Sequence, residues 1–374
     1  MQSIKNRKKY SIIKEDPFLW IPFLLLLFSG LIMLYSASGY LAEQRYGSQF
    51  FFVKKQFIFT LAGIIPFLFF RFLPYKYLKK TAYINILLSI FFLTAIFTTP
   101  FGHVVGGAAR WLKLGGISFQ PSVFSFYAIA VYLAFTISKH KENMHLFWPG
   151  VFPHIVLFFI FASFLYKQPD FGSIVIIAAL IVIMLLTGGA GLKYISAIAA
   201  AGIAMGSFFV IQEPYRVGRI LSFINPWKYS ENLSYQTTMS LKAFIHGGFF
   251  GRGLGGGILK MKRLPEAHTD FIFSIIGEET GFIGVTLIIV LFTIIIVRGF
   301  KIAEKTKDSF GSLLAVGITS IIGIHAVINM GVALSILPPK GLTLPFISYG
   351  GSSLVMNMAA VGILMNLGAS TNEK

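Results

Sequence analysis

Acidic side chains gather in one short stretch of this 374-residue sequence. Glu266 and Asp270 precede a strongly apolar region, and Glu278 and Glu279 fall just inside it. Carboxylates at or inside a membrane boundary cost free energy and usually serve a function. A positioned carboxylate can act as a general base that activates a hydroxyl for attack. A helix that begins near Asp270 would place Asp270, Ser274 and Glu278 at i, i+4 and i+8 on one face.

Each of these residues also has a structural interpretation, and the sequence leaves both open. Thr269 and Asp270 are preferred N-cap residues, so Asp270 could cap the following helix. Glu278 and Glu279 could lie exposed at the level of lipid headgroups. His268 alone is more often a hydrogen-bonding loop residue than a ligand or a base.

Basic residues outnumber acids between positions 213 and 270. A solvated surface would explain them, and the sharper interpretation is an anion site for phosphate or pyrophosphate headgroups beside a membrane. The cations are Arg216, Arg219, Lys228, Lys242, Arg252, Lys260, Lys262 and Arg263, against Glu213, Glu231, Glu266 and Asp270.

A second unusual region runs from residue 329 to residue 353. Prolines, glycines and hydroxyls interrupt an otherwise apolar sequence there, which is tolerated at membrane depth only where protein or a polar cavity re-satisfies the backbone. We therefore expect this segment to line a site. Lys340 could contact an anion or snorkel to the surface, and Ser352 could hydrogen-bond between helices. A serine nucleophile is disfavoured because no oriented base accompanies it.

The elements that must position these residues are membrane helices. The chain is 55% hydrophobic and 12% charged, whereas soluble domains carry about 25% charge. We expect an all-α polytopic membrane protein, a single domain over 1–374, with about ten spans of roughly 20 residues. They lie near 17–37, 55–73, 81–99, 122–138, 149–166, 173–187, 192–211, 273–297, 311–336 and 344–367.

The distribution of Lys and Arg over the short loops sets the expected orientation, because cytoplasmic loops carry the positive charge. Both termini are then cytoplasmic, and one long loop, about 212–270, lies outside the membrane and is expected to be ordered. The cytoplasmic cations are Lys5, Arg7, Lys8, Lys9, Lys14, Lys76, Lys79, Lys80, Lys139, Lys141, Arg298, Lys301, Lys305 and Lys307.

Several classes of function are disfavoured. The chain contains no cysteine, so it has neither disulfides nor a thiol metal site. The G-x-G-x-G pattern within 251–257 lacks the βαβ context of a dinucleotide site. A Walker A pattern is absent, which argues against self-contained ATP-driven transport. Nucleic acid is an implausible partner for a basic loop outside the membrane.

The sequence closely resembles the SEDS family (shape, elongation, division and sporulation) along essentially its whole length. Further matching blocks lie at 34–38, 109–115, 120–122, 168–173, 219–226, 235–236 and 264–273. The sequences of 340–348 and 276–279 resemble the division branch more than the elongation branch. The signature residues are Asn329, Gly331, Pro338, Lys340, Gly341, Leu344, Pro345 and the run 348–353.

This resemblance implies a peptidoglycan glycosyltransferase that polymerises lipid II and releases undecaprenyl pyrophosphate at the division septum. It implies a class B penicillin-binding transpeptidase and other divisome membrane proteins as partners. Asp270 maps to the essential acid of the family and is the implied catalytic base. A divalent cation could share the charge of the leaving group, although no ligand cluster demands one. The expected substrate-binding residues are Arg110, Trp111, Arg216, Arg219, Gln236, Glu278, Lys340 and Ser352.

The sequence departs from the family pattern at Val123 and Phe126, where Glu and Lys are usual. Their absence keeps a non-catalytic scaffold for a transpeptidase in consideration. A lipid II flippase is a further alternative, and it should need charged groups along a path across the bilayer. His325 replaces an uncharged polar residue and is interpreted as a hydrogen-bonded packing histidine. Asp170 is interpreted as a helix cap.

Overall fold

A computed structural model describes residues 16–371 apart from 106, 116, 213–216, 219–222, 229–233 and 262–263. Seven helices in this part of the chain are long and apolar enough to cross a membrane, and three shorter apolar helices accompany them. They are α1 (Pro17–Tyr46), α2 (Phe51–Phe72), α4 (Ala82–Thr98), α5 (Pro121–Lys139), α6 (Phe152–Lys167), α7 (Phe171–Thr187), α8 (Leu192–Ile211), α11 (Ile272–Lys305), α12 (Ser309–Ala333) and α13 (Gly351–Thr371). The expected multi-span helical fold is confirmed.

Shorter helices connect these spans. α3 (Lys76–Lys80) follows α2, and two single-turn elements, Lys141–Asn143 and Phe147–Val151, link α5 to α6. α10 (Tyr235–Gly247) lies within the predicted long loop and packs against α11. The prediction that this loop is ordered holds for its residues 234–261 and 264–270. Residues 213–216, 219–222, 229–233 and 262–263 of the predicted loop lie outside the described residues.

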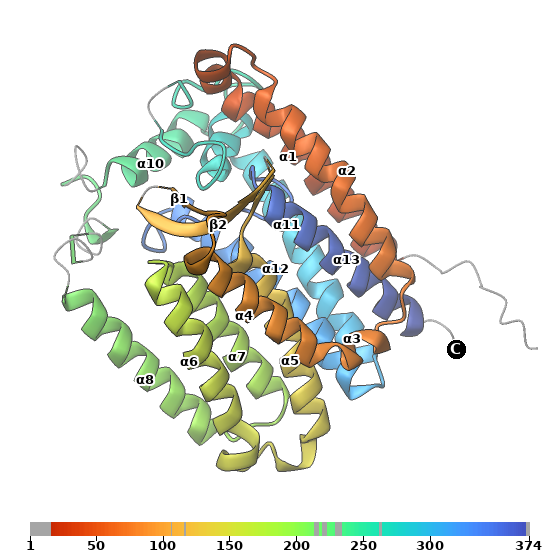
Figure 1. Cartoon of the computed structure of the whole chain (residues 1–374). Coiled ribbons are helices and arrows are strands. Elements are labelled where there is room, and N and C mark those ends of the chain that lie inside the picture. Colours follow the sequence, from red (N-terminus) through yellow and green to blue (C-terminus); the bar gives the residue numbers. More distant parts are fainter. Residues whose placement is uncertain are drawn as a thin grey trace, which may run out of the picture.

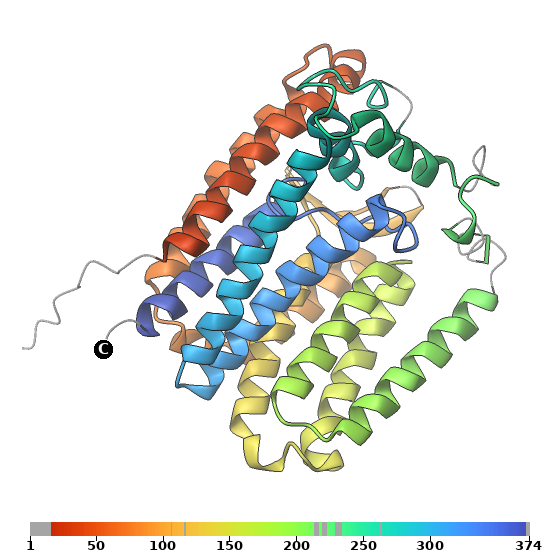
Figure 2. The ribbon, with the colours of Figure 1, turned by 180° about the vertical axis from the view of Figure 1, so that it is seen from behind.

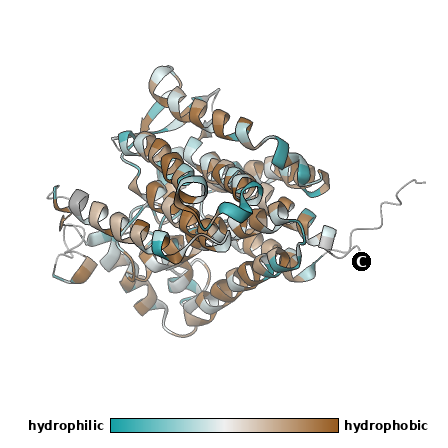
Figure 3. Ribbon diagram, turned by 90° about the horizontal axis from the view of Figure 1, so that it is seen from below, coloured by the Kyte–Doolittle hydropathy of each residue, from teal (hydrophilic) through white to brown (hydrophobic). Residues whose placement is uncertain are grey.

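The outer helices are apolar on the faces that they turn away from the bundle. Ile65 on α2 is 72% exposed and Leu87 on α4 is 66% exposed. Figure 3 shows brown, hydrophobic residues on outward as well as inward faces. Monomeric soluble proteins rarely expose apolar patches of this extent, so these faces are the lipid-contacting surface of a membrane protein.

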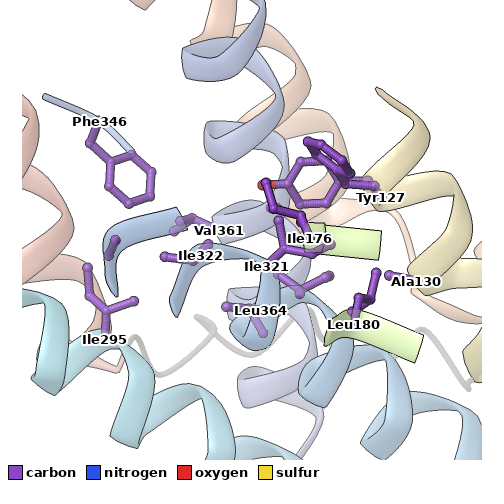
Figure 4. Close-up of a cluster of buried hydrophobic side chains, with 14 of the residues drawn as sticks. Tyr127, Ala130, Ile176, Leu180, Ile295, Ile321, Ile322, Phe346, Val361 and Leu364 are labelled. Atoms are coloured by element: carbon purple, nitrogen blue, oxygen red, sulfur yellow. The ribbon is translucent and has the colours of Figure 1, made fainter. Parts of the chain in front are cut away.

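The interior is a continuous apolar core centred on α12, which packs against α5, α7, α11 and α13. Buried side chains from several of these helices interdigitate, as Figure 4 shows for Tyr127, Ile176, Ile321 and Leu364. α12 is buried along most of its length. This central helix carries Asn329 near its C-terminal end, and so places this side chain at one end of the bundle.

The two ends of the bundle differ in chemistry. At one end, Arg298 pairs with Asp16, and Asn366 contacts the backbone of Arg71. We call this the basic end, because the lysines of α3 and of the α11–α12 connection also lie there. Asp16 and Thr371, the first and last described residues, both belong to it. Figures 1 and 2 show α10 and the small sheet at the opposite end, which we call the site end.

A three-stranded antiparallel sheet at the site end is an addition to the helical fold that the hydropathy pattern did not predict. It consists of β1 (Gly102–Val105), β2 (Ala108–Leu114) and β3 (Ile117–Phe119) in the order β1-β2-β3. Gly107 and Gly115 adopt positive φ angles at the two turns, a conformation that glycine adopts without steric cost. The two Gly-Gly pairs, at 106–107 and 115–116, are each flanked by apolar residues and are a hairpin signal that the hydropathy pattern missed.

The last predicted span also needs correction. Helix α13 begins at Gly351, so residues 344–350 are not helical. Ser348 Oγ accepts a hydrogen bond from the backbone nitrogen of Leu344 at 2.8 Å and donates to the carbonyl of Thr269 at 2.6 Å. The non-helical backbone is therefore satisfied by protein, as expected for irregular structure at membrane depth.

Candidate active site

Asp270 lies at the site end, just before α11. Helix α11 begins at Ile272, and its N-cap position is Phe271, which makes no side-chain cap. Asp270 is therefore not a helix cap, and the predicted i, i+4, i+8 stack with Ser274 and Glu278 does not form. Ser274 instead shares a hydrogen bond with Ser240 of α10 at 2.5 Å.

The backbone around Asp270 is held by the 340–349 segment. The Asn329 amide donates to the carbonyl of Asp270 at 2.9 Å and to the carbonyl of Leu342 at 2.6 Å. The backbone nitrogen of Tyr349 donates to the carbonyl of His268 at 3.0 Å. Two segments about 70 residues apart in the chain are thereby joined, and each supplies one wall around the carboxylate.

The surroundings of Asp270 favour its protonated form. Burial raises the pKa of this half-buried carboxyl to about 7, the negative charge of Glu266 contributes to the rise, and the Arg110 guanidinium acts in the opposite direction. Desolvation destabilises the ionised form of a carboxyl group. A pKa close to the working pH is the property that suits a general base.

Two predicted cations meet at the α6–α7 connection. The Arg110 guanidinium, on β2, donates to the carbonyl of Gln168 at 3.2 Å and also to that of Pro169. Lys340 Nζ donates to the carbonyl of Phe171 at 3.3 Å. The same short segment, residues 168–171, thus fixes both cations at the site end, and the effect of Arg110 on the pKa of Asp270 places Arg110 within electrostatic range of the carboxylate.

Three other predicted residues lie at the same end of the bundle. Trp111 follows Arg110 on β2, half-buried, and opposes His103 of β1. Ser352, in the first turn of α13, accepts a hydrogen bond from the nitrogen of Gln120 at 3.1 Å and donates to the carbonyl of Ser118 of β3 at 3.3 Å. The second bond ties the sheet to α13. Gln236 lies half-buried on α10. Predicted residues Arg216 and Arg219 lie outside the described residues.

Glu278 and Glu279 face the glycine-rich loop and not Asp270. Glu278 is fully buried and accepts hydrogen bonds from the backbone nitrogens of Ile258 and Leu259, at 2.9 and 3.3 Å. Glu279 binds Lys260 Nζ at 2.6 Å and the nitrogen of Gly255 at 3.0 Å. This placement corrects the exposed-headgroup interpretation of both acids. The expected contact of Glu278 with substrate stays a prediction.

Two other structural interpretations, those of Asp170 and His325, are confirmed. Asp170 is the N-cap of α7 and accepts a hydrogen bond from the nitrogen of Ser173. His325 is buried, bonds the carbonyl of Ile321 at 2.8 Å, and packs its ring on Phe126 with centroids 5.2 Å apart. Val123 and Phe126 are both buried. The usual charged pair is replaced here by apolar packing between α5 and α12.

Sequence reasoning missed the supporting residues of the site. Asn329 and Gly341 were named only as members of the 329–353 signature, without roles, and Ser348 was considered only as a serine that could hydrogen-bond between helices. Their signal was the interrupted helix itself, because polar and small residues in such a break must satisfy backbone or line a site. Within the described part of the chain, no group of three or more His, Asp or Glu residues is placed to hold a metal ion.

Comparison with known proteins agrees with this geometry. The sequence pattern of the FtsW/RodA/SpoVE family, described as cell cycle proteins, matches residues 17–373. The chain belongs to this family. A probable peptidoglycan glycosyltransferase FtsW from Trichlorobacter lovleyi is 39% identical over 363 residues, covering 97% of this chain and 95% of the relative. Stage V sporulation protein E of Bacillus subtilis is 38% identical over 352 residues, 94% of this chain and 96% of the relative.

Solved structures of FtsW/RodA/SpoVE relatives share the fold. A chain from a peptidoglycan synthase complex that coordinates polymerization and crosslinking superposes with a TM-score of 0.81 at 23% identity, covering 96% of this chain and 99% of that chain. RodA of Thermus thermophilus superposes with a TM-score of 0.71 at 22% identity and the same coverage. Several curated FtsW/RodA/SpoVE relatives bear the FtsW name, in agreement with the predicted division branch.

Proposed function

We propose that this protein is a peptidoglycan glycosyltransferase that polymerises lipid II on the outer face of the cytoplasmic membrane at the division septum. One observation carries the proposal: a half-buried carboxylate, Asp270, with a pKa raised to about 7, shares the site end with Arg110 and Lys340. The FtsW names of relatives 38–39% identical support the same reaction class.

In the proposed reaction, Asp270 takes the proton of a sugar hydroxyl on the acceptor lipid II. The hydroxyl oxygen then attacks the anomeric carbon of the growing donor chain. The bond between that carbon and the pyrophosphate breaks, and undecaprenyl pyrophosphate leaves with the electron pair. A general base contributes about 10²–10⁴-fold to such a step.

Cations would stabilise the charge that develops on the leaving pyrophosphate. Arg110 and Lys340 are the candidates because both are anchored to the 168–171 segment. Arg110 acts electrostatically on Asp270, and Lys340 is next in the chain to Gly341, which faces the carboxylate of Asp270. Preorganised charges of this kind are usually the largest catalytic contribution. Arg110 would act on two groups, because its charge also opposes the rise of the pKa of Asp270.

The distribution of acids supports a polymerase over a flippase. Among the described residues, Glu43, Asp170, Glu266, Asp270, Glu278 and Glu279 belong to the site end, and Asp16, Glu142, Glu304 and Asp308 to the basic end. A flippase would need charged groups along a path between the two ends. The apolar packing of Val123 and Phe126 leaves a scaffold as the competing function, which an activity assay decides.

The proposed partner is a class B penicillin-binding transpeptidase, together with other membrane proteins of the divisome. One structural relative belongs to a complex that coordinates polymerization and crosslinking. Coupling of the two reactions would require the polymerase and the crosslinking enzyme to lie on the same face of the membrane. The site end, with its sheet and α10, is the face we assign to that contact.

The test uses full-length protein in lipid nanodiscs with fluorescent lipid II, with and without its transpeptidase, and glycan strands resolved on a gel. Asp270→Asn is expected to abolish polymerisation, because the amide cannot accept the proton. Asp16→Asn is the matched control, since Asp16 pairs with Arg298 at the basic end. If the Asp270→Asn variant made glycan strands at the wild-type rate, Asp270 would not be the general base. If the wild-type protein made no strands even with its transpeptidase, the protein would be a scaffold.

A further inference from the structure

Asn329 connects the two walls of the candidate site. It lies near the end of α12, only 1% exposed. Its amide nitrogen donates to the carbonyl of Asp270 at 2.9 Å and to the carbonyl of Leu342 at 2.6 Å. One side chain on the central, buried helix therefore holds both the backbone of Asp270 and the 340–349 segment.

Asparagine suits this position because its amide nitrogen carries two protons. Both are used, one for each carbonyl. A rotated amide would bring its oxygen against two carbonyl oxygens, so the two acceptors fix the orientation of the side chain. Among the described residues, the Asn329 Oδ1 atom has no hydrogen-bond donor, so the nitrogen alone makes the connection.

The second wall approaches the carboxylate of Asp270 directly. A Cβ atom on Gly341 would lie 2.9 Å from Oδ2 of Asp270, closer than such contacts normally allow. Gly341 precedes Leu342, whose carbonyl Asn329 holds. The amide of Asn329 thus sets the backbone of Asp270 and, on the other side, the backbone that faces its carboxylate.

We propose that Asn329 is a positioning residue that fixes the carboxylate of Asp270 against the 340–342 backbone in the geometry needed for proton transfer. This inference rests on the proposed function, because it requires Asp270 to be the base. Asn329 is not itself a catalytic residue, since its contacts in the described structure are to backbone carbonyls.

Loss of this amide should affect the rate in two ways. A base displaced by about 1 Å can lose roughly 10²-fold in rate. Release of the two walls also admits water to the carboxylate, which reduces the desolvation that raises the pKa of Asp270. The other charged groups at the site are Glu266 on its own segment, Arg110 on β2 and Lys340 on the facing segment.

The experiment measures the initial rate of lipid II consumption against lipid II concentration at each of several pH values, in nanodiscs containing the full chain, so that kcat and KM are obtained separately. Asn329→Ala is compared with Asn366→Ala. Asn366 is a matched control at the basic end: its amide donates to the carbonyl of Arg71 at 2.7 Å, and its Oδ1 accepts from the nitrogen of Tyr75 at 3.2 Å. Thermal melting of each variant reports the structural cost of losing the amide.

Asn329→Ala is expected to lower kcat by about 10- to 100-fold with little change in KM. The acid limb of the pH profile, which is the rise in kcat as Asp270 loses its proton, should move to lower pH. The Asn366→Ala variant should keep the acid limb at its wild-type pH, even if its melting temperature falls as far as that of Asn329→Ala. A wild-type kcat and limb for Asn329→Ala, with Asp270→Asn inactive, would overturn the positioning role and leave the proposed function standing.

A second variant covers the case in which Asn329→Ala fails to fold. Gly341→Ala keeps the amide but pushes the carboxylate of Asp270 away from its wall, and a comparable loss of kcat is expected. If the Gly341→Ala variant kept the wild-type kcat and acid limb, proton transfer would not depend on how Asp270 packs against the 340–342 backbone, and the proposal would fail. An active Asp270→Asn variant would instead contradict the proposed function of Asp270 as the base, and with it the positioning role of Asn329.

Discussion

At the scale of single residues, the site depends on opposing influences on one carboxyl group. Burial and Glu266 raise the pKa of Asp270, and Arg110 lowers it. Glu266 also shapes the turn, because its carbonyl accepts hydrogen bonds from the nitrogens of Thr269 and Phe271, each at 3.2 Å. The protonation of the base near neutral pH is therefore set by its two charged neighbours as well as by burial.

Substitution of these two neighbours is expected to move the acid limb of the polymerisation rate in opposite directions. The rate should rise with pH as Asp270 loses its proton. Glu266→Gln removes a negative charge, lowers the pKa of Asp270 and moves the limb to lower pH. Arg110→Gln removes a positive charge and moves the limb to higher pH. The measurement is the lipid II polymerisation rate against pH, and shifts of the same sign would contradict the assignment.

At the scale of elements, the glycine-rich loop completes a broken helix. Helix α11 is interrupted at Gly281, which has a φ of 63°. The freed nitrogen of Phe282 donates to the carbonyl of Gly248 at 2.9 Å, and the nitrogen of Gly253 donates to the carbonyl of Glu279 at 3.0 Å. The loop backbone thus replaces helical hydrogen bonds, and the buried acids Glu278 and Glu279 hold the loop in place.

This packing predicts unequal costs for two similar substitutions. Gly251 and Gly253 both have positive φ angles, 80° and 85°. A Cβ on Gly251 would lie 2.2 Å from the carbonyl oxygen of Glu279, whereas a Cβ on Gly253 would meet nothing within 4 Å. Gly253→Ala should cost about 1–2 kcal/mol of backbone strain.

Gly251→Ala should cost roughly 1–3 kcal/mol more, because of overpacking against α11. Thermal melting of the purified variants measures the difference. Equal melting temperatures for the two variants would show that the loop does not press against α11.

At the scale of the whole molecule, the bundle separates its charges between two ends. The site end carries Asp270, the sheet and α10, and the basic end carries the lysine-rich connections and both described termini. Apolar helix faces lie between them. The positive-inside rule assigns the basic end to the cytoplasm, so we place the site outside.

Cysteine labelling of the purified band tests this assignment, and the chain itself gives no background because it contains no cysteine. Gln49, at the site end, and Lys76, at the basic end, are both exposed. A membrane-impermeant maleimide applied to intact cells should label the Gln49→Cys variant, and it should label the Lys76→Cys variant only after permeabilisation. The reverse pattern would place Asp270 in the cytoplasm and remove the proposed reaction.

Local patterns in the sequence were sufficient for the membrane helices, whereas the choice of Asp270 as the candidate base came from the family resemblance. Spans of apolar residues predicted the ten apolar helices because burial in lipid depends mainly on composition over about 20 residues. The caps and the packing histidine, Asp170 and His325, followed from residue type and position. The sheet at 102–119 was missed even though its Gly-Gly turns are also a local signal.

Only the tertiary structure decided which side chains meet. Asn329 reaches Asp270 and Leu342, and Lys260 reaches Glu279, because helices and loops distant in the chain pack side by side. Glu278 has the residue type expected in a substrate site, yet it turns toward the loop backbone. Residue type and spacing determine what a side chain can do, whereas its partner and its pKa depend on neighbours that the fold brings from elsewhere in the chain.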